Sequence, residues 1–130
     1  MLGRLRALIA EDNAEWRDII TDFVGSECDV VGNAERGDEI VPLALQLQPD
    51  LVTLDISMPG QSGLRAIPSL STALPDAILI VISTIDNRLY RDEASRLGAD
   101  YYVPKRSVIS DLIPAIRRGR LSTQRNPRLA

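Results

Sequence analysis

The sequence contains no histidine, which removes the side chain that most often acts as a general base or a metal ligand. Its single cysteine, Cys28, has no partner in the chain for a disulfide. We expect its small thiol to be buried in the core as a structural residue. Of the fifteen basic residues, fourteen are arginines, and Lys105 is the only lysine. Any chemistry in this chain therefore rests on carboxylates, hydroxyls and basic side chains.

Long apolar runs are also missing. No segment approaches the roughly 20 apolar residues of a transmembrane helix, and residues 1–10 lack the apolar core of a signal peptide, so we expect a cytoplasmic protein. The length of 130 residues and the hydrophobic content of 45% suit one domain with one core. The net charge of −3 argues against direct binding of nucleic acid by this segment.

Short apolar runs alternate with amphipathic stretches along the chain. The runs predict strands at Leu5–Ala10, Asp29–Gly32, Leu51–Asp55, Ala77–Ile82 and Tyr101–Val103. The stretches predict helices at about Ala14–Ser26, Gly37–Gln48, from Leu64 onward, Asn87–Leu97 and Val108–Arg118. Pro68 interrupts the third helical pattern, and the sequence does not explain it. The alternation predicts an α/β fold, a doubly wound five-stranded parallel sheet with helices on both faces.

The chain divides unevenly into a domain and a short polar end. Residues 1–119 hold all the strand and helix patterns, and we expect them to form one domain. Residues 120–130 have little apolar content, which is typical of a tail or the start of a linker. Such an end suits a connection to a further domain as well as the end of a single-domain protein.

Polar residues follow the ends of four of the predicted strands. They are Glu11 and Asp12 after the first strand, Asp55 at the third, Ser83 at the fourth and Lys105 after the fifth. Ligands of an open parallel sheet bind outside the carboxyl ends of its strands, so we expect these residues to face one crevice. Taken alone, each has an ordinary explanation as a helix cap, a strand-end hydroxyl or a solvated cation. Their joint placement favours a site.

The residue types at this crevice indicate phosphate chemistry. Three carboxylates close together repel one another, and a bound cation relieves that repulsion. One or two direct carboxylates suit Mg²⁺, while Lys105 would neutralise phosphate oxygens as a point charge. With no histidine or cysteine near the crevice, the available nucleophile is a carboxylate that forms an acyl phosphate. Asp55 is the best candidate, and the Ser83 hydroxyl would bind a phosphoryl oxygen.

Taken together, these motifs closely resemble the receiver domains of bacterial two-component response regulators. The resemblance runs from about residue 5 to residue 119. Its strongest pieces are Ala-Glu-Asp-Asn at 10–13, Asp-Leu-Val-Thr-Leu-Asp at 50–55, Met-Pro-Gly at 58–60 with Gly63, Ser83, and Gly-Ala-Asp at 98–100 leading to Lys105. The combined pattern is highly specific, and it implies the flavodoxin-like fold of a receiver.

The resemblance also implies a signalling function. A histidine kinase or phosphotransfer protein would donate a phosphoryl group to Asp55, so the chain would be a phosphoprotein switch that catalyses only its own phosphorylation and dephosphorylation. Asp12 and Asp55 would bind Mg²⁺ directly, and Glu11 would act mostly through water. The backbone carbonyl of Ser57 would be a further metal ligand.

The switch itself is assigned by the same resemblance. The switch hydroxyl is Ser83 rather than Thr84, and the switch aromatic is Tyr102, which without the motif would be explained as a ring covering the core. The two residues would move together on phosphorylation and change the surface around the fourth helix, fifth strand and fifth helix, where a homodimer can form. The output of the switch is not disclosed by the sequence.

Two departures from the family pattern lie near the crevice. Receivers commonly have a cis proline directly after the lysine, whereas here Pro104 precedes Lys105 and Arg106 follows it. The position after the switch hydroxyl is usually very small, so the bulkier Thr84 is expected to restrict access to Asp55 and slow its reaction.

Three other classes of protein compete with this interpretation. A receiver-like docking module would signal without phosphate turnover, but the chain retains the full set of acids, hydroxyl and lysine. A haloacid-dehalogenase-like hydrolase needs a second aspartate two residues after the first, where this chain has Ser57. A flavodoxin-type cofactor carrier would meet repulsion between the cofactor phosphate and the acids after the first strand.

Overall fold

The computed structural model describes residues 3–123. The strands are β1 (Leu5–Ala10), β2 (Cys28–Ala34), β3 (Leu51–Leu54), β4 (Ile78–Ser83) and β5 (Tyr101–Pro104). The helices are α1 (Ala14–Gly25), α2 (Ile40–Leu47), α3 (Gly63–Ala73), α4 (Arg88–Leu97) and α5 (Val108–Thr123). Single 3-10 turns, η1 (Gly37–Glu39) and η2 (Lys105–Ser107), precede α2 and α5. The alternation predicted from the sequence is therefore confirmed.

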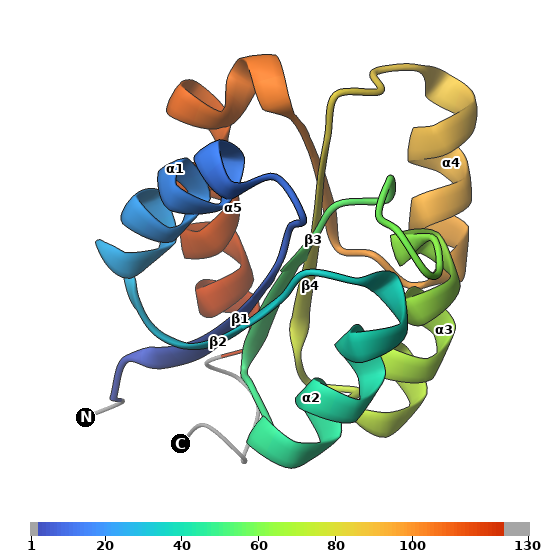
Figure 1. The fold of residues 1–130 in the computed structure, drawn as a ribbon. Helices are drawn as coiled ribbons and strands as arrows, with labels where there is room; N and C mark the ends of the chain where they lie inside the picture. The colour runs from blue at the N-terminus through green and yellow to red at the C-terminus, as the bar shows by residue number, and fades with distance from the viewer. Residues whose placement is uncertain (1–2, 124–130) are drawn as a thin grey trace.

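All neighbouring strands are parallel, in the order β2-β1-β3-β4-β5, which confirms the predicted doubly wound sheet (Figure 1). The register pairs Leu54 of β3 with Ala10 of β1 and with Val81 of β4. Beyond this row, the backbone N–H of Asp55 donates to the carbonyl of Ala10 at 3.0 Å. The residues that follow β1 and β3 consequently leave the sheet side by side at its carboxyl edge.

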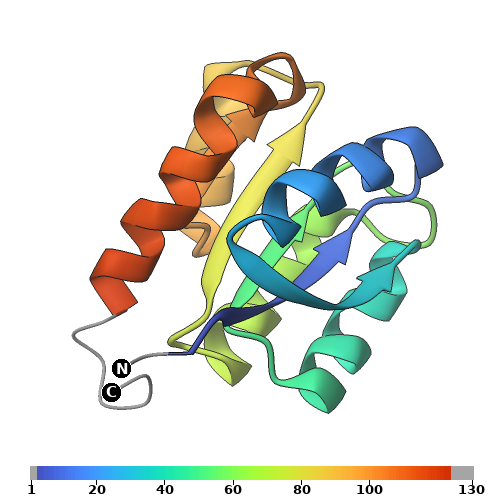
Figure 2. The same cartoon turned by 90° about the vertical axis from the view of Figure 1, so that its left-hand side faces the viewer.

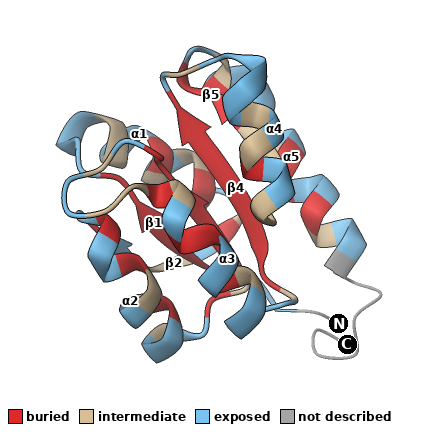
Figure 3. Ribbon diagram, turned by 90° about the vertical axis from the view of Figure 1, so that its right-hand side faces the viewer, coloured by how far each residue is buried: buried red, intermediate tan, exposed pale blue. Residues whose placement is uncertain are grey.

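Helices cover both faces of the sheet. Helices α1 and α5 lie on one face and α2, α3 and α4 on the other (Figures 1 and 2). Every residue of β4 is buried, as Figure 3 shows, because alternate side chains of this strand enter the two cores. Ile78, Ile80 and Ile82 pack with α1 and α5, whereas Leu79 and Val81 pack with the other three helices.

Helix α3 forms as predicted in spite of its proline, whereas α5 differs from the prediction. Pro68 lies inside α3, on its exposed face, where water can replace the missing N–H donor. Helix α5 continues past its predicted end at Arg118 to Thr123, although Gly119 is a common stop signal. A Cβ at Gly119 would lie 2.7 Å from the Ile78 side chain, so this glycine serves close packing of α5 on β4. Of the expected polar tail, residues 124–130 lie outside the described residues.

Two smaller expectations also have structural counterparts. Cys28 is buried, and burial raises the pKa of its thiol to about 11, which suits a structural residue. Among residues 3–123, no helix has the length and apolar character needed to cross a bilayer.

Candidate functional site

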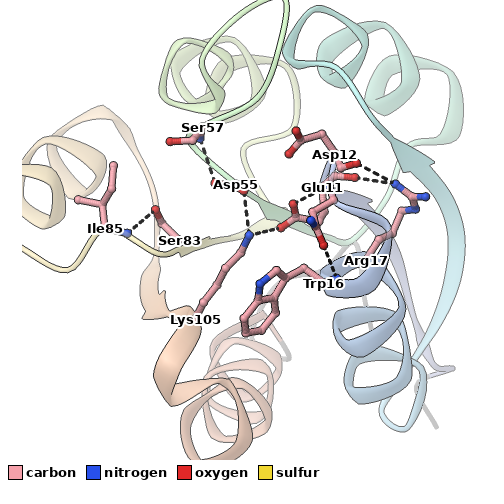
Figure 4. Close-up of polar contacts among 10 residues, drawn as sticks. Glu11, Asp12, Trp16, Arg17, Asp55, Ser57, Ser83, Ile85 and Lys105 are labelled. Carbon is pink, nitrogen blue, oxygen red and sulfur yellow. Dashed lines mark hydrogen bonds and ion pairs between the residues drawn. The ribbon is translucent and has the colours of Figure 1, made fainter.

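The residues predicted from the strand ends meet at the carboxyl edge of the sheet (Figure 4). Glu11 follows β1, Asp55 follows β3, Ser83 ends β4 and Lys105 begins η2 directly after β5. These four polar residues are buried, although most of the buried set is apolar. Buried polar groups are costly unless they have partners, so the arrangement marks the edge as a specific site.

Three carboxylates form an acidic cluster, which comprises Glu11, Asp12 and Asp55. One oxygen from each lies within 4.8 Å of the others. Asp12 is exposed, whereas Glu11 is 0% exposed and Asp55 is 6% exposed. Burial raises the pKa of Glu11, because the charged form loses its hydration. Carboxylate oxygens at this spacing, with one side open to solvent, fit a small divalent cation such as Mg²⁺.

Lys105 neutralises the buried side of the acidic cluster. Its Nζ lies 2.7 Å from Glu11 Oε1 and 3.0 Å from Asp55 Oδ2, and the lysine side chain is only 6% exposed. Both contacts are ion pairs, and the contact with Asp55 is also a hydrogen bond. Burial acts to lower the pKa of Lys105, but the two carboxylates outweigh it and raise the pKa. The lysine therefore stays protonated in the site.

Backbone N–H groups fix the other oxygens of the two buried acids. Ser57 N–H donates to Asp55 Oδ1 at 2.9 Å, and Asn13 N–H donates to Glu11 Oε2 at 3.1 Å. Asn13 also caps α1, since its Oδ1 accepts the N–H of Trp16 at 2.9 Å. The helix cap is thus Asn13, which leaves the acidic pair before it available to the crevice.

The loop between β3 and α3, which carries Ser57, is pinned to neighbouring backbone. Gly37 N–H donates to the carbonyl of Pro59 at 2.9 Å. A Cβ on Gly37 would lie 1.4 Å from the carbonyl oxygen of Gln61, and one on Gly63 would lie 2.1 Å from that of Asp55. Only glycine fits at these two close approaches, so both glycines help to set the loop beside the acidic cluster.

Ser83 and Tyr102 bond to the same residue. The hydroxyl oxygen of Ser83 accepts the N–H of Ile85 at 3.0 Å, and the Tyr102 hydroxyl donates to the carbonyl of Ile85 at 2.6 Å. Burial raises the pKa of Tyr102, so the phenol remains a neutral donor. The Arg91 guanidinium lies 5.2 Å from the centre of the Tyr102 ring. The loop from β4 to α4 therefore connects the two predicted switch residues.

The loops around Lys105 differ from the expected family geometry. Within residues 3–123 no peptide bond is cis, and Arg106, at the usual proline position, forms an ion pair with Asp86. Arg91 of α4 binds the same carboxylate at 2.6 Å. Asp86 consequently links the loop after β5 to α4. Thr84, beside Ser83, is exposed.

Sequence analysis missed several contacts at this site. Lys105 Nζ lies 5.1 Å from the centre of the ring of Trp16 in α1. Arg17 donates to the carbonyl of Glu11 at 3.1 Å and pairs with Glu35 at 3.1 Å. The role of Ile85 rests on its backbone, which carries no residue-specific signal. The contacts of Trp16 with Lys105, of Arg17 with Glu35 and of Tyr102 with Ile85 join segments that are distant along the chain, so no local pattern identifies them.

Comparison with known proteins agrees with this geometry. The family model described as the response regulator receiver domain matches residues 7–117. The chain belongs to this family. It is a receiver domain of a two-component response regulator, and its acidic cluster is typical of the Mg²⁺ site of receivers.

Individual relatives support the assignment. This receiver is 32% identical over 116 residues to the uncharacterized transcriptional regulatory protein YxjL of Bacillus subtilis, covering 88% of this chain and 53% of YxjL. It therefore spans about half the length of that relative. The response regulator domain of Thermotoga maritima CheB is 30% identical, with a TM-score of 0.81 and coverage of 90% of this chain and 96% of that one. The BeF3-activated N-terminal receiver domain of Klebsiella pneumoniae RstA is 25% identical, with a TM-score of 0.80 and coverage of 88% and 97%.

Proposed function

We propose that this receiver accepts a phosphoryl group on Asp55 from a histidine kinase or phosphotransfer protein. The observation that carries the proposal is the position of Asp55, whose oxygens contact the Lys105 ammonium on one side and belong to the acidic cluster on the other. Asp12, Asp55 and the carbonyl of Ser57 would hold Mg²⁺ directly, with Glu11 acting through water. When bound, Mg²⁺ neutralises charge on the carboxylate and phosphoryl oxygens.

Three residues of this chain have separate roles in the proposed transfer of the phosphoryl group. A carboxylate oxygen of Asp55 forms the new bond to phosphorus while the bond from phosphorus to the donor nitrogen breaks. The Ser57 N–H, already bonded to Asp55 Oδ1, orients the nucleophile. The Lys105 ammonium, which now contacts Asp55 Oδ2, binds an oxygen of the incoming phosphoryl group as a positive point charge.

The proposed switch follows from the shared contacts of Ile85. In the phosphorylated state the Ser83 hydroxyl donates to a phosphoryl oxygen, and this movement weakens its contact with the Ile85 N–H. The shift of the loop displaces the carbonyl that accepts the Tyr102 hydroxyl, so the ring position responds to phosphate. Phosphorylation thus selects one of two loop conformations. The surface around α4, β5 and α5 would carry the signal, for example by homodimer formation.

Access to Asp55 is part of the same proposal. Thr84 is exposed next to Ser83, and its side chain would hinder small phosphodonors and water at the crevice. Thr84→Ala is expected to gain and lose the phosphoryl group faster than the parent protein. Equal rates in the two proteins would remove Thr84 from the mechanism.

The decisive experiment measures the mass of the protein after incubation with Mg²⁺ and acetyl phosphate. We expect the wild-type protein to gain one phosphoryl group and Asp55→Asn to gain none. Asp76→Asn is the matched control, since Asp76 lies before β4 at the opposite edge of the sheet and should leave the reaction unchanged.

Beryllofluoride provides a second probe, as the RstA receiver was solved in a BeF3-activated form. Trp16, the only tryptophan, would report its binding by fluorescence. If wild type shows neither a mass gain nor a fluorescence change, the chain acts as a docking module without phosphate turnover.

A further inference from the structure

The single tryptophan and the single lysine of the chain lie against each other at the edge of the acidic cluster. Lys105 Nζ is 5.1 Å from the centre of the Trp16 ring, within the range of a cation–π contact (Figure 4). Trp16 comes from the first turn of α1, whereas Lys105 follows β5. The half-buried indole packs against the core formed with α1 and α5. The packing therefore fixes the position of the indole ring.

Among residues 3–123, the Lys105 ammonium contacts two charged side chains and one neutral ring. The charged partners are Glu11 at 2.7 Å and Asp55 at 3.0 Å. Both also belong to the acidic cluster that suits a divalent cation. A cation bound there would share these carboxylates and repel the ammonium. The Trp16 ring binds no metal, so its attraction for the ammonium does not depend on whether the acidic cluster holds a divalent cation.

We propose that Trp16 is a positioning residue for Lys105, whose ammonium it holds beside Asp55 when a divalent cation competes for the carboxylates. The inference rests on the proposed phosphoacceptor function and deepens it. The lysine must reach a phosphoryl oxygen at the moment of transfer. Its ammonium is carried on a flexible four-carbon stem, which can easily rotate it away from that oxygen. The indole face limits this freedom without adding a charge that would bind the metal or the phosphate.

The expected size of the effect follows from the strength of a cation–π contact. A partly desolvated contact of this kind corresponds to about a three- to thirty-fold change in an equilibrium or rate constant. Trp16→Leu should lower the rate of phosphorylation by acetyl phosphate by about this factor. Trp16→Phe, which keeps an aromatic face, should recover part of the loss.

The matched control is Phe23→Leu. Phe23 is another half-buried aromatic residue of α1, and it packs against the same core as Trp16. Its replacement removes comparable packing about two helical turns along α1 from Trp16. A loss of rate that came only from a weakened α1 would appear in Phe23→Leu as well.

A direct measurement of the contact uses the metal-free protein with labelled lysine. Because Lys105 is the only lysine, its ε-methylene protons give one assignable NMR signal. We expect the indole ring current to shift this signal upfield in wild type and in Phe23→Leu, and we expect the shift to disappear in Trp16→Leu. This readout does not depend on Mg²⁺, phosphate or activity.

The outcomes separate the two proposals. A wild-type protein that gains no phosphoryl group from acetyl phosphate overturns the proposed function. A wild type that is phosphorylated while Trp16→Leu matches Phe23→Leu in rate overturns the positioning role alone. An unshifted lysine signal in wild type overturns the contact itself. Support requires the upfield shift, its loss in Trp16→Leu, and a slower rate in that variant that Trp16→Phe partly restores.

Discussion

Replacing Lys105 with methionine tests the electrostatics of the site most directly. Lys105→Met retains an unbranched apolar chain but removes the charge that lies between Glu11 and Asp55. Both acids are buried, so the variant leaves two carboxylates in a poorly hydrated place with no cation between them. Breaking a buried ion pair in this way costs about 3 to 5 kcal/mol of unfolding free energy. That is a large part of the about 5 to 15 kcal/mol that stabilises an ordinary domain.

Two conditions should reduce this loss. Lower pH should help, because burial already raises the pKa of Glu11 and protonation of this acid removes one of the two repelling charges. Mg²⁺ should also help, because it can supply positive charge to the same carboxylates. At a free concentration one hundred times its dissociation constant, a ligand that binds only the folded state contributes about 2.7 kcal/mol. We expect Lys105→Met to bind Mg²⁺ more tightly than wild type, since the competing ammonium is absent.

The assay is urea unfolding followed by far-ultraviolet circular dichroism, with EDTA and with Mg²⁺. Arg106→Met is the matched control, because it removes the neighbouring cation, whose side chain is 66% exposed and paired with Asp86. An exposed pair of this kind contributes little to the unfolding free energy, because water screens its charges. If Lys105→Met is no less stable than Arg106→Met in EDTA, or if Mg²⁺ stabilises both equally, then Lys105 does not neutralise the acidic cluster.

Three further predictions concern other parts of the chain. Gly37→Ala should weaken Mg²⁺ binding by about tenfold in a fluorescence titration, because the added methyl group would lie 1.4 Å from a carbonyl oxygen of the β3–α3 loop; Gly25→Ala, where nothing lies within 4 Å, should not. Thr53→Val should raise the unfolding free energy by about 1 to 3 kcal/mol, since the Thr53 hydroxyl is buried without a protein partner, and unchanged stability would indicate a hidden one. Asp100 is an exposed residue, but partial desolvation of its carboxyl raises its pKa above the ordinary value of 3.8, so its contribution to stability is full below that value and is lost as pH rises through the raised one. Asp100→Asn should therefore gain stability relative to wild type between acid and neutral pH, and a constant difference in thermal midpoint would contradict this.

Much of the site was predictable because its residues lie where local patterns change. The apolar run of β1 ends at Glu11, and that of β3 ends at Asp55. In a parallel sheet such ends share one edge, so the sequence predicts that these carboxylates lie at the same edge, and the pairing of β3 with β1 in the structure places them side by side. The absence of histidine and the single lysine narrowed the chemistry further.

Helix α5 shows where local signals fail. Its sequence predicts an end near Arg118, before a glycine that ordinarily stops a helix. The structure continues to Thr123 because the glycine fits against Ile78 of β4, and packing outweighs the intrinsic preference of one residue. Pro68 in α3 is a similar case, since an exposed helical face tolerates the missing N–H.

The sequence by itself determined the alternation of strands and helices, the polar residues at the strand ends and therefore the resemblance to a receiver domain. These properties depend on neighbours along the chain, which apolar periodicity and turn residues encode directly. Only the tertiary structure decided that Lys105 pairs with Glu11 as well as Asp55, that its ammonium lies on the ring of Trp16, and that one loop residue bonds both Ser83 and Tyr102. These contacts depend on strand register and on the seating of α1 and α5 against the sheet. No local pattern carries that information, because distances between remote segments are fixed only when the core packs.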